Sequence, residues 1–147
     1  MGAAEEDRNR RLLRARDLID RRSTEALDVD LLARTAHMAR AHFIREFRAT
    51  FGETPHRYLQ RRRIERAMTL LRTTDRPVTQ VCMEVGFSSL GTFSRTFREV
   101  VGVPPSAFRT GADPATGFVP TTFRMRWTRP AGDRRPSADG VSPTRAP

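Results

Sequence analysis

The sequence contains no lysine, so all 27 of its basic residues are arginine. It has one cysteine, Cys82, which excludes a disulfide within the chain and any metal site built from several cysteines. No run of about 18 apolar residues is present, and the N-terminal stretch is too polar for a signal peptide. We therefore expect a cytoplasmic protein that does not insert into a membrane.

The sequence also lacks the residue patterns of an enzyme or a metal protein. No nucleophile, base and acid occur together at a recognisable spacing, and no glycine-rich phosphate loop is present. His37 and His42 are five positions apart and would lie on different faces of a helix, while His56 belongs to another segment. Cys82 is predicted to be a buried, inert thiol. We expect no catalytic residue, no metal and no cofactor.

Positive charge is abundant. The formal net charge is +10, and residues 7–109 contain 21 arginines against 12 acidic residues, so the region expected to fold is itself basic. A small, strongly basic protein favours polyanionic partners. The chain length allows one domain of about 100 residues plus a tail. We expect no separate ligand-sensing domain and no small-molecule effector site.

One sequence pattern occurs twice. Residues 43–48 and 93–98 share the pattern Phe-x-Arg-x-Phe-Arg, and a glycine, a proline and an aromatic residue follow at matched positions in both copies. This repeat predicts two copies of one supersecondary unit. The two phenylalanines of each copy are four positions apart and share a helix face, while the arginine between them lies opposite. A short apolar helix and a tight turn precede each copy, which predicts two helix-turn-helix units.

The helical periodicity and the capping residues predict an all-α fold with seven helices, in which one long helix joins the two units. Asp28 or Asp30 is expected to cap the second helix, and Ser88 or Ser89 the sixth. The expected ranges are 10–21, 28–36, 40–51, 55–73, 78–85, 89–101 and 105–108. We place the domain that contains both helix-turn-helix units at 8–109. Residues 110–147 are rich in proline and arginine and are predicted to be mostly disordered, although 119–127 alternates like a short strand, a docking segment or a basic arm.

The repeat also predicts a DNA-binding face on the third and sixth helices. Three positions on each helix follow the spacing i, i+4, i+7 on the side opposite the phenylalanines. We call this set the reading face: Ala41, Arg45, Arg48, Gly91, Arg95 and Arg98. Five further candidates for DNA contact flank it: Arg40, Ile44, Ser89, Leu90 and Ser94.

The reading-face residues have different expected roles. Arg45 and Arg95 are the candidates for bidentate contact with guanine, whereas Arg48 and Arg98 are nearer the helix ends and are expected to neutralise phosphates. The apolar side chains among the flanking candidates are expected to contact thymine methyl groups. An isolated surface arginine is most often a solvated charge. The recurrence at matched positions favours DNA contact.

A set of fixed spacings resembles the DNA-binding domain of the AraC/XylS family of bacterial transcription regulators. The matching residues are Arg63-Ile64-x-x-Ala67-x-x-Leu70-Leu71, Val78-x-x-Val81-Cys82-x-x-Val85-Gly86-Phe87-Ser88, Phe93-x-Arg95-x-Phe97-Arg98-x-x-x-Gly102 and Pro105-x-x-Phe108-Arg109. The resemblance implies a stand-alone, MarA-like regulator whose monomer contacts two successive major-groove segments of double-stranded DNA. It also implies promoter activation through contact with RNA polymerase.

Several positions depart from the expected pattern. Ala39 stands where the family usually has a serine, so the third helix is expected to lack a side-chain cap. Ala41 and Gly91 are small, so part of any specificity is expected to come from DNA shape. Of the run 61–63, one or two arginines are expected to contact phosphate, while Arg63 is expected to brace the core.

Two other functions remain open at this stage. An architectural, nonspecific DNA-binding protein would need only the high charge and the small side chains on the reading face, and it predicts a steep salt dependence. A helical protein-interaction module would keep its function after charge reversal at Arg45 and Arg95. The sequence leaves open the target promoters, activation versus repression, oligomeric state and whether a longer regulator contains this chain.

Overall fold

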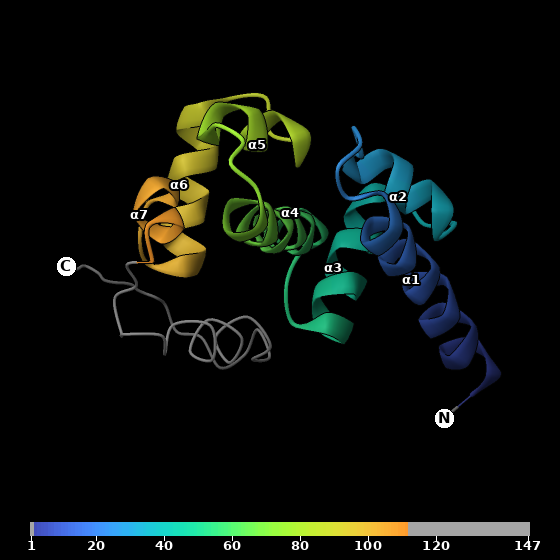
Figure 1. Ribbon diagram of the computed structural model, residues 1–147. Helices are drawn as coiled ribbons and strands as arrows, with labels where there is room; N and C mark the ends of the chain where they lie inside the picture. The colour runs from blue at the N-terminus through green and yellow to red at the C-terminus, as the bar shows by residue number, and fades with distance from the viewer. Residues whose placement is uncertain (1, 112–147) are drawn as a thin grey trace.

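The computed structural model describes residues 2–111, and this part of the chain is entirely helical (Figure 1). Its seven helices occur in the predicted order: α1 (Ala3–Arg22), α2 (Val29–Thr35), α3 (Arg40–Phe51), α4 (Pro55–Thr73), α5 (Val78–Glu84), α6 (Leu90–Val101) and α7 (Pro105–Arg109). The predictions for 119–127 and for most of the extension after 110 lie outside the described residues. No helix within 2–111 combines the length and the apolar character needed to cross a membrane.

Two separate hydrophobic cores divide the described chain into two units. The first core gathers side chains from α1, α2, α3 and the start of α4, and the second gathers side chains from the rest of α4 with α5, α6 and α7. Within α4, Leu59 belongs to the first core, whereas Ile64 and Leu71 belong to the second. The long helix predicted to join the two units therefore contributes to both cores.

The second helix of each helix-turn-helix unit is its recognition helix, α3 in the first unit and α6 in the second. These two helices flank α4 in Figure 1 and run in the same direction. α2 precedes α3 and α5 precedes α6, with a short turn between the two members of each pair. At the first turn His37 has a φ of 56°, and at the second Gly86 has a φ of 106°. Each left-handed residue reverses the chain so that the second helix can pack across the first. The predicted pair of helix-turn-helix units is confirmed.

Local sequence signals set most of the helix ends. The side chain of Asp28 accepts a hydrogen bond from the Leu31 amide (2.8 Å), and Ser89 accepts one from Thr92 (3.3 Å), so these two residues are the caps rather than Asp30 and Ser88. Ala39 provides no side-chain cap for α3, as expected. α3 and α6 end at glycines in the left-handed conformation, which costs glycine little.

The first helix was predicted too short. α1 begins at Ala3 rather than near residue 10, because its first turns are stabilised by charge rather than by apolar periodicity. Glu5 and Glu6 lie in the first turn, where negative side chains interact favourably with the helix dipole. Asp7 and Arg11 form an ion pair (3.0 Å) one turn apart. At the other end of the described chain, α7 extends to Arg109.

Candidate nucleic-acid interface

The repeated phenylalanines fix the rotation of each recognition helix about its axis. Phe43 and Phe47 on α3, and Phe93 and Phe97 on α6, are completely buried. The two rings of each helix contact each other, with centroids 5.6 Å apart on α3 and 5.8 Å apart on α6. Because these pairs face the two cores, the opposite side of each helix faces outward.

The four arginines of the reading face are exposed and have no partners within residues 2–111. The side chains of Arg45, Arg48, Arg95 and Arg98 take part in no ion pair, hydrogen bond or aromatic contact there. Each guanidinium can therefore turn toward a base edge or a phosphate without breaking an internal interaction. This freedom occurs at the same two positions in both units, which is the arrangement that two groove-binding helices require.

The small residues of the reading face are exposed as well. Ala41 and Gly91 lie on the surface of the first turns of α3 and α6. A Cβ atom added at Gly91 would meet only the Ser89 hydroxyl oxygen, at an unstrained 3.7 Å. The fold therefore does not require glycine at this position, and the absence of a side chain leaves this part of the reading face open.

The flanking candidates differ in their exposure and in whether another residue already binds them. Leu90 is 44% exposed, whereas Ile44 and Ser94 are half-buried. Arg40 is exposed but pairs with Asp30 at 3.1 Å, a link that sequence patterns did not predict. Ser89 is exposed and uses its hydroxyl oxygen as the α6 cap.

His42 is not among the predicted DNA-contact residues, but it lies next to the reading face. His42 is exposed on α3 and follows Ala41, so it lies at the edge of the reading face. The helical spacing of Ala41, Arg45 and Arg48 also indicates this edge position for His42. Among the described residues no three His, Cys, Asp or Glu side chains are arranged to hold a metal ion.

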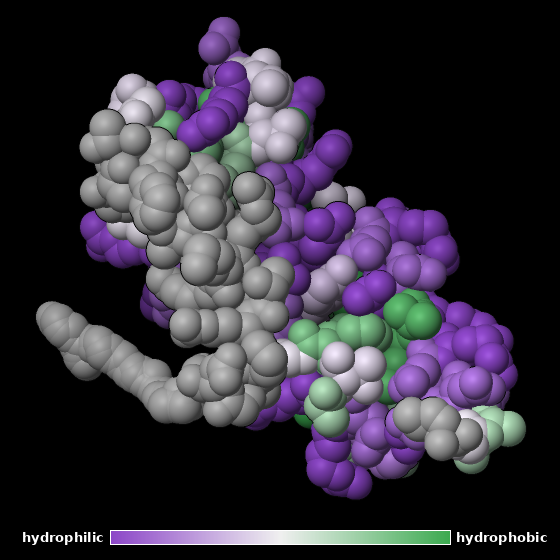
Figure 2. Space-filling model, turned by 90° about the horizontal axis from the view of Figure 1, so that it is seen from below, coloured by the Kyte–Doolittle hydropathy of each residue, from purple (hydrophilic) through white to green (hydrophobic). Residues whose placement is uncertain are grey.

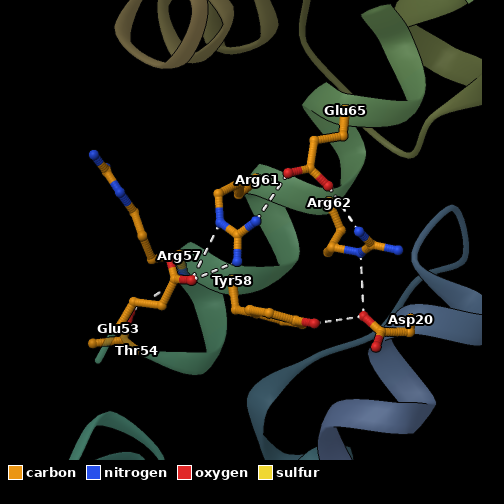
Figure 3. Close-up of polar contacts among 8 residues, drawn as sticks. All are labelled: Asp20, Glu53, Thr54, Arg57, Tyr58, Arg61, Arg62 and Glu65. Atoms are coloured by element: carbon orange, nitrogen blue, oxygen red, sulfur yellow. Dashed lines mark hydrogen bonds and ion pairs between the residues drawn. The ribbon is translucent and has the colours of Figure 1, made fainter. Parts of the chain in front are cut away.

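The arginine run on α4 is bound internally rather than presented to a ligand (Figure 3). Arg61 donates to Glu53 (2.7 Å) and to Glu65 (2.9 Å). Arg62 pairs with Asp20 on α1 (3.2 Å) and with Glu65 (2.8 Å). The expectation that one or two arginines of this run contact phosphate is therefore not supported for Arg61 or Arg62, because carboxylates already neutralise both.

Tyr58 and Arg63 complete the links around α4. The Tyr58 hydroxyl donates to Asp20 at 2.7 Å, and burial together with this hydrogen bond raises the pKa of Tyr58 (Figure 3). Arg63 is only 9% exposed and donates to backbone carbonyls of Ser23 and Glu25. The prediction that Arg63 braces the core is confirmed.

The pair of Glu53 and Arg61 lies deeper than the other ion pairs. The Glu53 side chain is 7% exposed and the Arg61 side chain 13%. Arg61 donates two hydrogen bonds to Glu53, from Nε and Nη2, and both reach Oε2. Within residues 2–111 the Oε1 of Glu53 has no hydrogen-bond partner. Burial raises the pKa of Glu53 despite the neighbouring guanidinium. The matched position in the second unit is Val103, so this polar link exists only in the first.

This geometry predicts unequal effects when the two partners are replaced. Arg61→Met removes the only guanidinium within residues 2–111 that donates hydrogen bonds to the buried Glu53 carboxylate, so we expect a loss of about 2–3 kcal/mol in the free energy of unfolding at neutral pH. Glu53→Gln leaves Arg61 paired with Glu65 and should cost about 1 kcal/mol. Urea unfolding followed by circular dichroism measures both values.

The pH dependence of the Arg61→Met variant provides the control. Without Arg61 the pKa of Glu53 in the folded state rises further above its unfolded value, so the folded protein binds the extra proton first. The stability deficit of the variant should therefore shrink as the pH falls through this pKa. A deficit that is the same at acidic and neutral pH, or an equal cost for the two substitutions, would contradict this account of the pair.

The surface is predominantly hydrophilic. In the view from below most of the described residues are hydrophilic, and one green patch of adjoining hydrophobic residues lies among them (Figure 2). Only three large apolar side chains within residues 2–111 are exposed: Leu13, Met83 and Leu90. They come from three different helices, α1, α5 and α6.

Comparisons with known proteins agree with this geometry. A family model described as "Helix-turn-helix domain" matches residues 32–111. The regulatory protein SoxS of Escherichia coli strain K12 is 34% identical over 91 residues, which are 62% of this chain and 85% of SoxS. The probable transcriptional regulator LumQ of Photobacterium leiognathi is 32% identical over 91 residues, but the chain spans only 37% of its length.

Solved structures show the same fold. The DNA-binding domain of the global transcriptional factor AdpA, crystallised with a target DNA, superposes with a TM-score of 0.65 and 33% identity, covering 68% of this chain and 90% of that domain. A transcriptional regulator with an AraC-type DNA-binding domain from Chromobacterium violaceum gives a TM-score of 0.64 and 30% identity, covering 72% and 96% of the two chains. The chain belongs to the AraC/XylS-type helix-turn-helix family, whose members are DNA-binding transcription regulators rather than enzymes.

Proposed function

We propose that this protein binds two successive major-groove segments on one face of double-stranded DNA as a monomer, with α3 in one segment and α6 in the next. The observation that supports this most directly is the matched set of exposed arginines without partners at Arg45, Arg48, Arg95 and Arg98. The parallel course of the two helices beside α4 is compatible with adjacent segments (Figure 1). The DNA-binding domain of AdpA, which has the same fold, was crystallised with a target DNA, and this supports DNA as the partner here.

Within this proposal the contacts divide by position. Arg45 and Arg95, near the middle of their helices, contact guanine edges, while Arg48 and Arg98 neutralise phosphates. The remaining proposed contacts come from the first turns and flanks of the two helices: Arg40, Ala41, Ile44, Ser89, Leu90, Gly91 and Ser94. The DNA-binding domain comprises residues 8–109, and the protein acts in the cytoplasm, at the nucleoid.

We further propose that the bound protein activates promoters by contacting RNA polymerase. This step is supported by the family resemblance and by the share of SoxS, a regulatory protein, that the chain spans. In this role the protein is controlled by its abundance, as the resemblance to stand-alone, MarA-like regulators implies.

Selection of bound sequences from a random DNA library at near-physiological salt tests the DNA-binding proposal. The native protein, Arg45→Ala and Arg95→Ala are selected in parallel. We expect a two-part motif with centres about 10 bp apart, because successive major-groove segments are one helical turn apart. Each substitution should remove sequence information from a different part, since each arginine serves one unit.

The matched control is Arg10→Ala, which removes an exposed arginine of α1 that has no partner within the described residues. It should yield the native motif. One specific observation favours the architectural alternative, namely the small side chains of Ala41 and Gly91 on the reading face. Tight, salt-sensitive binding without any motif would support that alternative. The absence of binding would direct attention to protein partners.

A further inference from the structure

Arg63 occupies the boundary between the two cores. On α4, Leu59 is the last residue that belongs to the first core, and Ile64 is the first that belongs to the second. Arg63 lies between these two positions and is almost fully buried. A charged side chain at a boundary between apolar regions must be satisfied by polar groups nearby, because an unpaired buried charge is strongly unfavourable.

The guanidinium of Arg63 is bound to the first unit by two hydrogen bonds. Its Nε donates to the carbonyl oxygen of Ser23 at 2.7 Å, and its Nη2 donates to that of Glu25 at 2.8 Å. Both carbonyls belong to the segment between α1 and α2. The planar guanidinium donates along two fixed directions, so the pair of bonds orients this segment relative to α4.

The same guanidinium also contacts the second unit. Its Cζ lies 6.0 Å from the centroid of the Phe87 ring, within the range of a cation–π contact. Gly86 approaches even more closely, since a Cβ atom built at this glycine would lie 2.7 Å from the Arg63 Nε. Both residues belong to the turn between α5 and α6. One side chain therefore touches the α1–α2 segment and the α5–α6 turn at once.

The contacts of Arg63 fix the relative orientation of the two units more specifically than the other polar link between them. No carboxylate within residues 2–111 pairs with Arg63, and burial lowers its pKa, so the two backbone carbonyls supply the polar environment of the charge. A second link, between Arg57 on α4 and Glu99 on α6, has a nitrogen–oxygen distance of 3.8 Å and about half-exposed side chains. Exposed pairs of this kind constrain geometry weakly.

We propose that Arg63 is a positioning residue that fixes the orientation of the first unit relative to the second and thereby sets the half-site spacing that the protein accepts. This inference rests on the two-segment binding proposed above. Two linked binding modules gain affinity from each other only when their geometry matches the spacing of their sites. A looser link lowers the affinity for the correct spacing and reduces the penalty for an incorrect one.

The test compares native protein, Arg63→Met and Arg63→Lys on a series of labelled DNA duplexes. The series contains the selected two-part site, versions in which base pairs are inserted or deleted between the parts, and duplexes with a single part. The matched control is Arg66→Met, because Arg66 is on the same helix, is exposed and has no hydrogen bond or ion pair within the described residues. Fluorescence anisotropy gives each dissociation constant, and thermal unfolding confirms that each variant is folded.

We expect the native protein and Arg66→Met to prefer the correct spacing by about 100-fold over a half-turn displacement. Arg63→Met should reduce this preference by about tenfold, while its dissociation constants for single parts stay within about twofold of the native values. Arg63→Lys keeps the charge but loses the planar fork, so its spacing preference should be intermediate. If Arg63→Met does not fold, Arg63→Lys decides the question.

Two results would overturn the inference while leaving the two-segment function intact. One is that the Arg63 variants keep the spacing preference of the native protein. The other is that they lose affinity equally for all duplexes, including those with a single part, which would indicate a general structural role. A native protein that is indifferent to spacing would overturn the two-segment function itself, and this inference with it.

Discussion

The double variant Arg45→Ala/Arg95→Ala is expected to bind the selected two-part site about 2–6 kcal/mol more weakly than the native protein. One bidentate arginine–guanine contact is worth about 1–3 kcal/mol of discrimination, and the two arginines belong to separate units, so their contributions should add. Both side chains are exposed and without partners in the described structure, so their removal costs little folding stability. Titrations of the selected duplex and of a scrambled duplex at one fixed salt concentration measure the loss.

The comparison of the two duplexes distinguishes base recognition from charge neutralisation. Arg48 and Arg98 remain in the double variant, so binding to the scrambled duplex should change much less than binding to the selected one. Arg10→Ala/Arg66→Ala removes the same charge outside the recognition helices and should weaken both duplexes slightly and equally. An equal, large loss on both duplexes for Arg45→Ala/Arg95→Ala would show that these arginines neutralise phosphates only.

Replacement of Phe97 by alanine is expected to destabilise the second unit by about 3–5 kcal/mol. The side chain is fully buried, and its ring lies 5.8 Å from that of Phe93 and 5.6 Å from that of Phe108. Its removal costs the transfer free energy of the ring and leaves a cavity that α6 and α7 cannot fill. Because the first unit has its own core, its amides should keep their protection. Hydrogen–deuterium exchange resolved by peptide reports the two units separately.

The corresponding substitution in the first unit is Phe47→Ala. Phe47 is fully buried in the first core, where its ring contacts Phe51 at 4.6 Å and Tyr58 at 5.9 Å. The loss of protection should now be confined to α1, α2, α3 and the start of α4. Leu13→Ala, at a partly exposed position, serves as a control with little expected effect. Equal loss of protection in both units for either phenylalanine would show that the two cores unfold as one cooperative structure.

Local signals predicted the helices well. The boundaries of α3 and α4 follow from Gly52, Thr54 and Pro55, each of which acts through its own backbone or its nearest neighbours. The burial of the four repeated phenylalanines follows from their spacing alone. The start of α1 was missed because ion pairs and the helix dipole stabilise its first turns, and neither leaves a pattern of apolar residues.

The sequence predicted which side of α3 and α6 faces outward. It did not predict which arginines have carboxylate partners elsewhere in the chain. Helical spacing placed the arginines of the reading face on the surface, but it did not distinguish them from Arg61 and Arg62, which are consecutive in sequence with Arg63. The partners that distinguish them lie elsewhere in the chain: Asp20 reaches Arg62 from α1, and Glu53 reaches Arg61 from the loop after α3. The carbonyls bound by Arg63 are 38 and 40 residues away. Only the tertiary structure brings these groups together.

The separation of the two cores has a consequence for the divergence of such regulators. A substitution that alters packing or base contacts in one unit is not transmitted through a shared interior to the other. If the protein binds two DNA segments as proposed, natural selection can revise one half of the operator while the other half still contributes its own contacts. New specificity can arise by a sequence of partial changes, each of which leaves a functional intermediate.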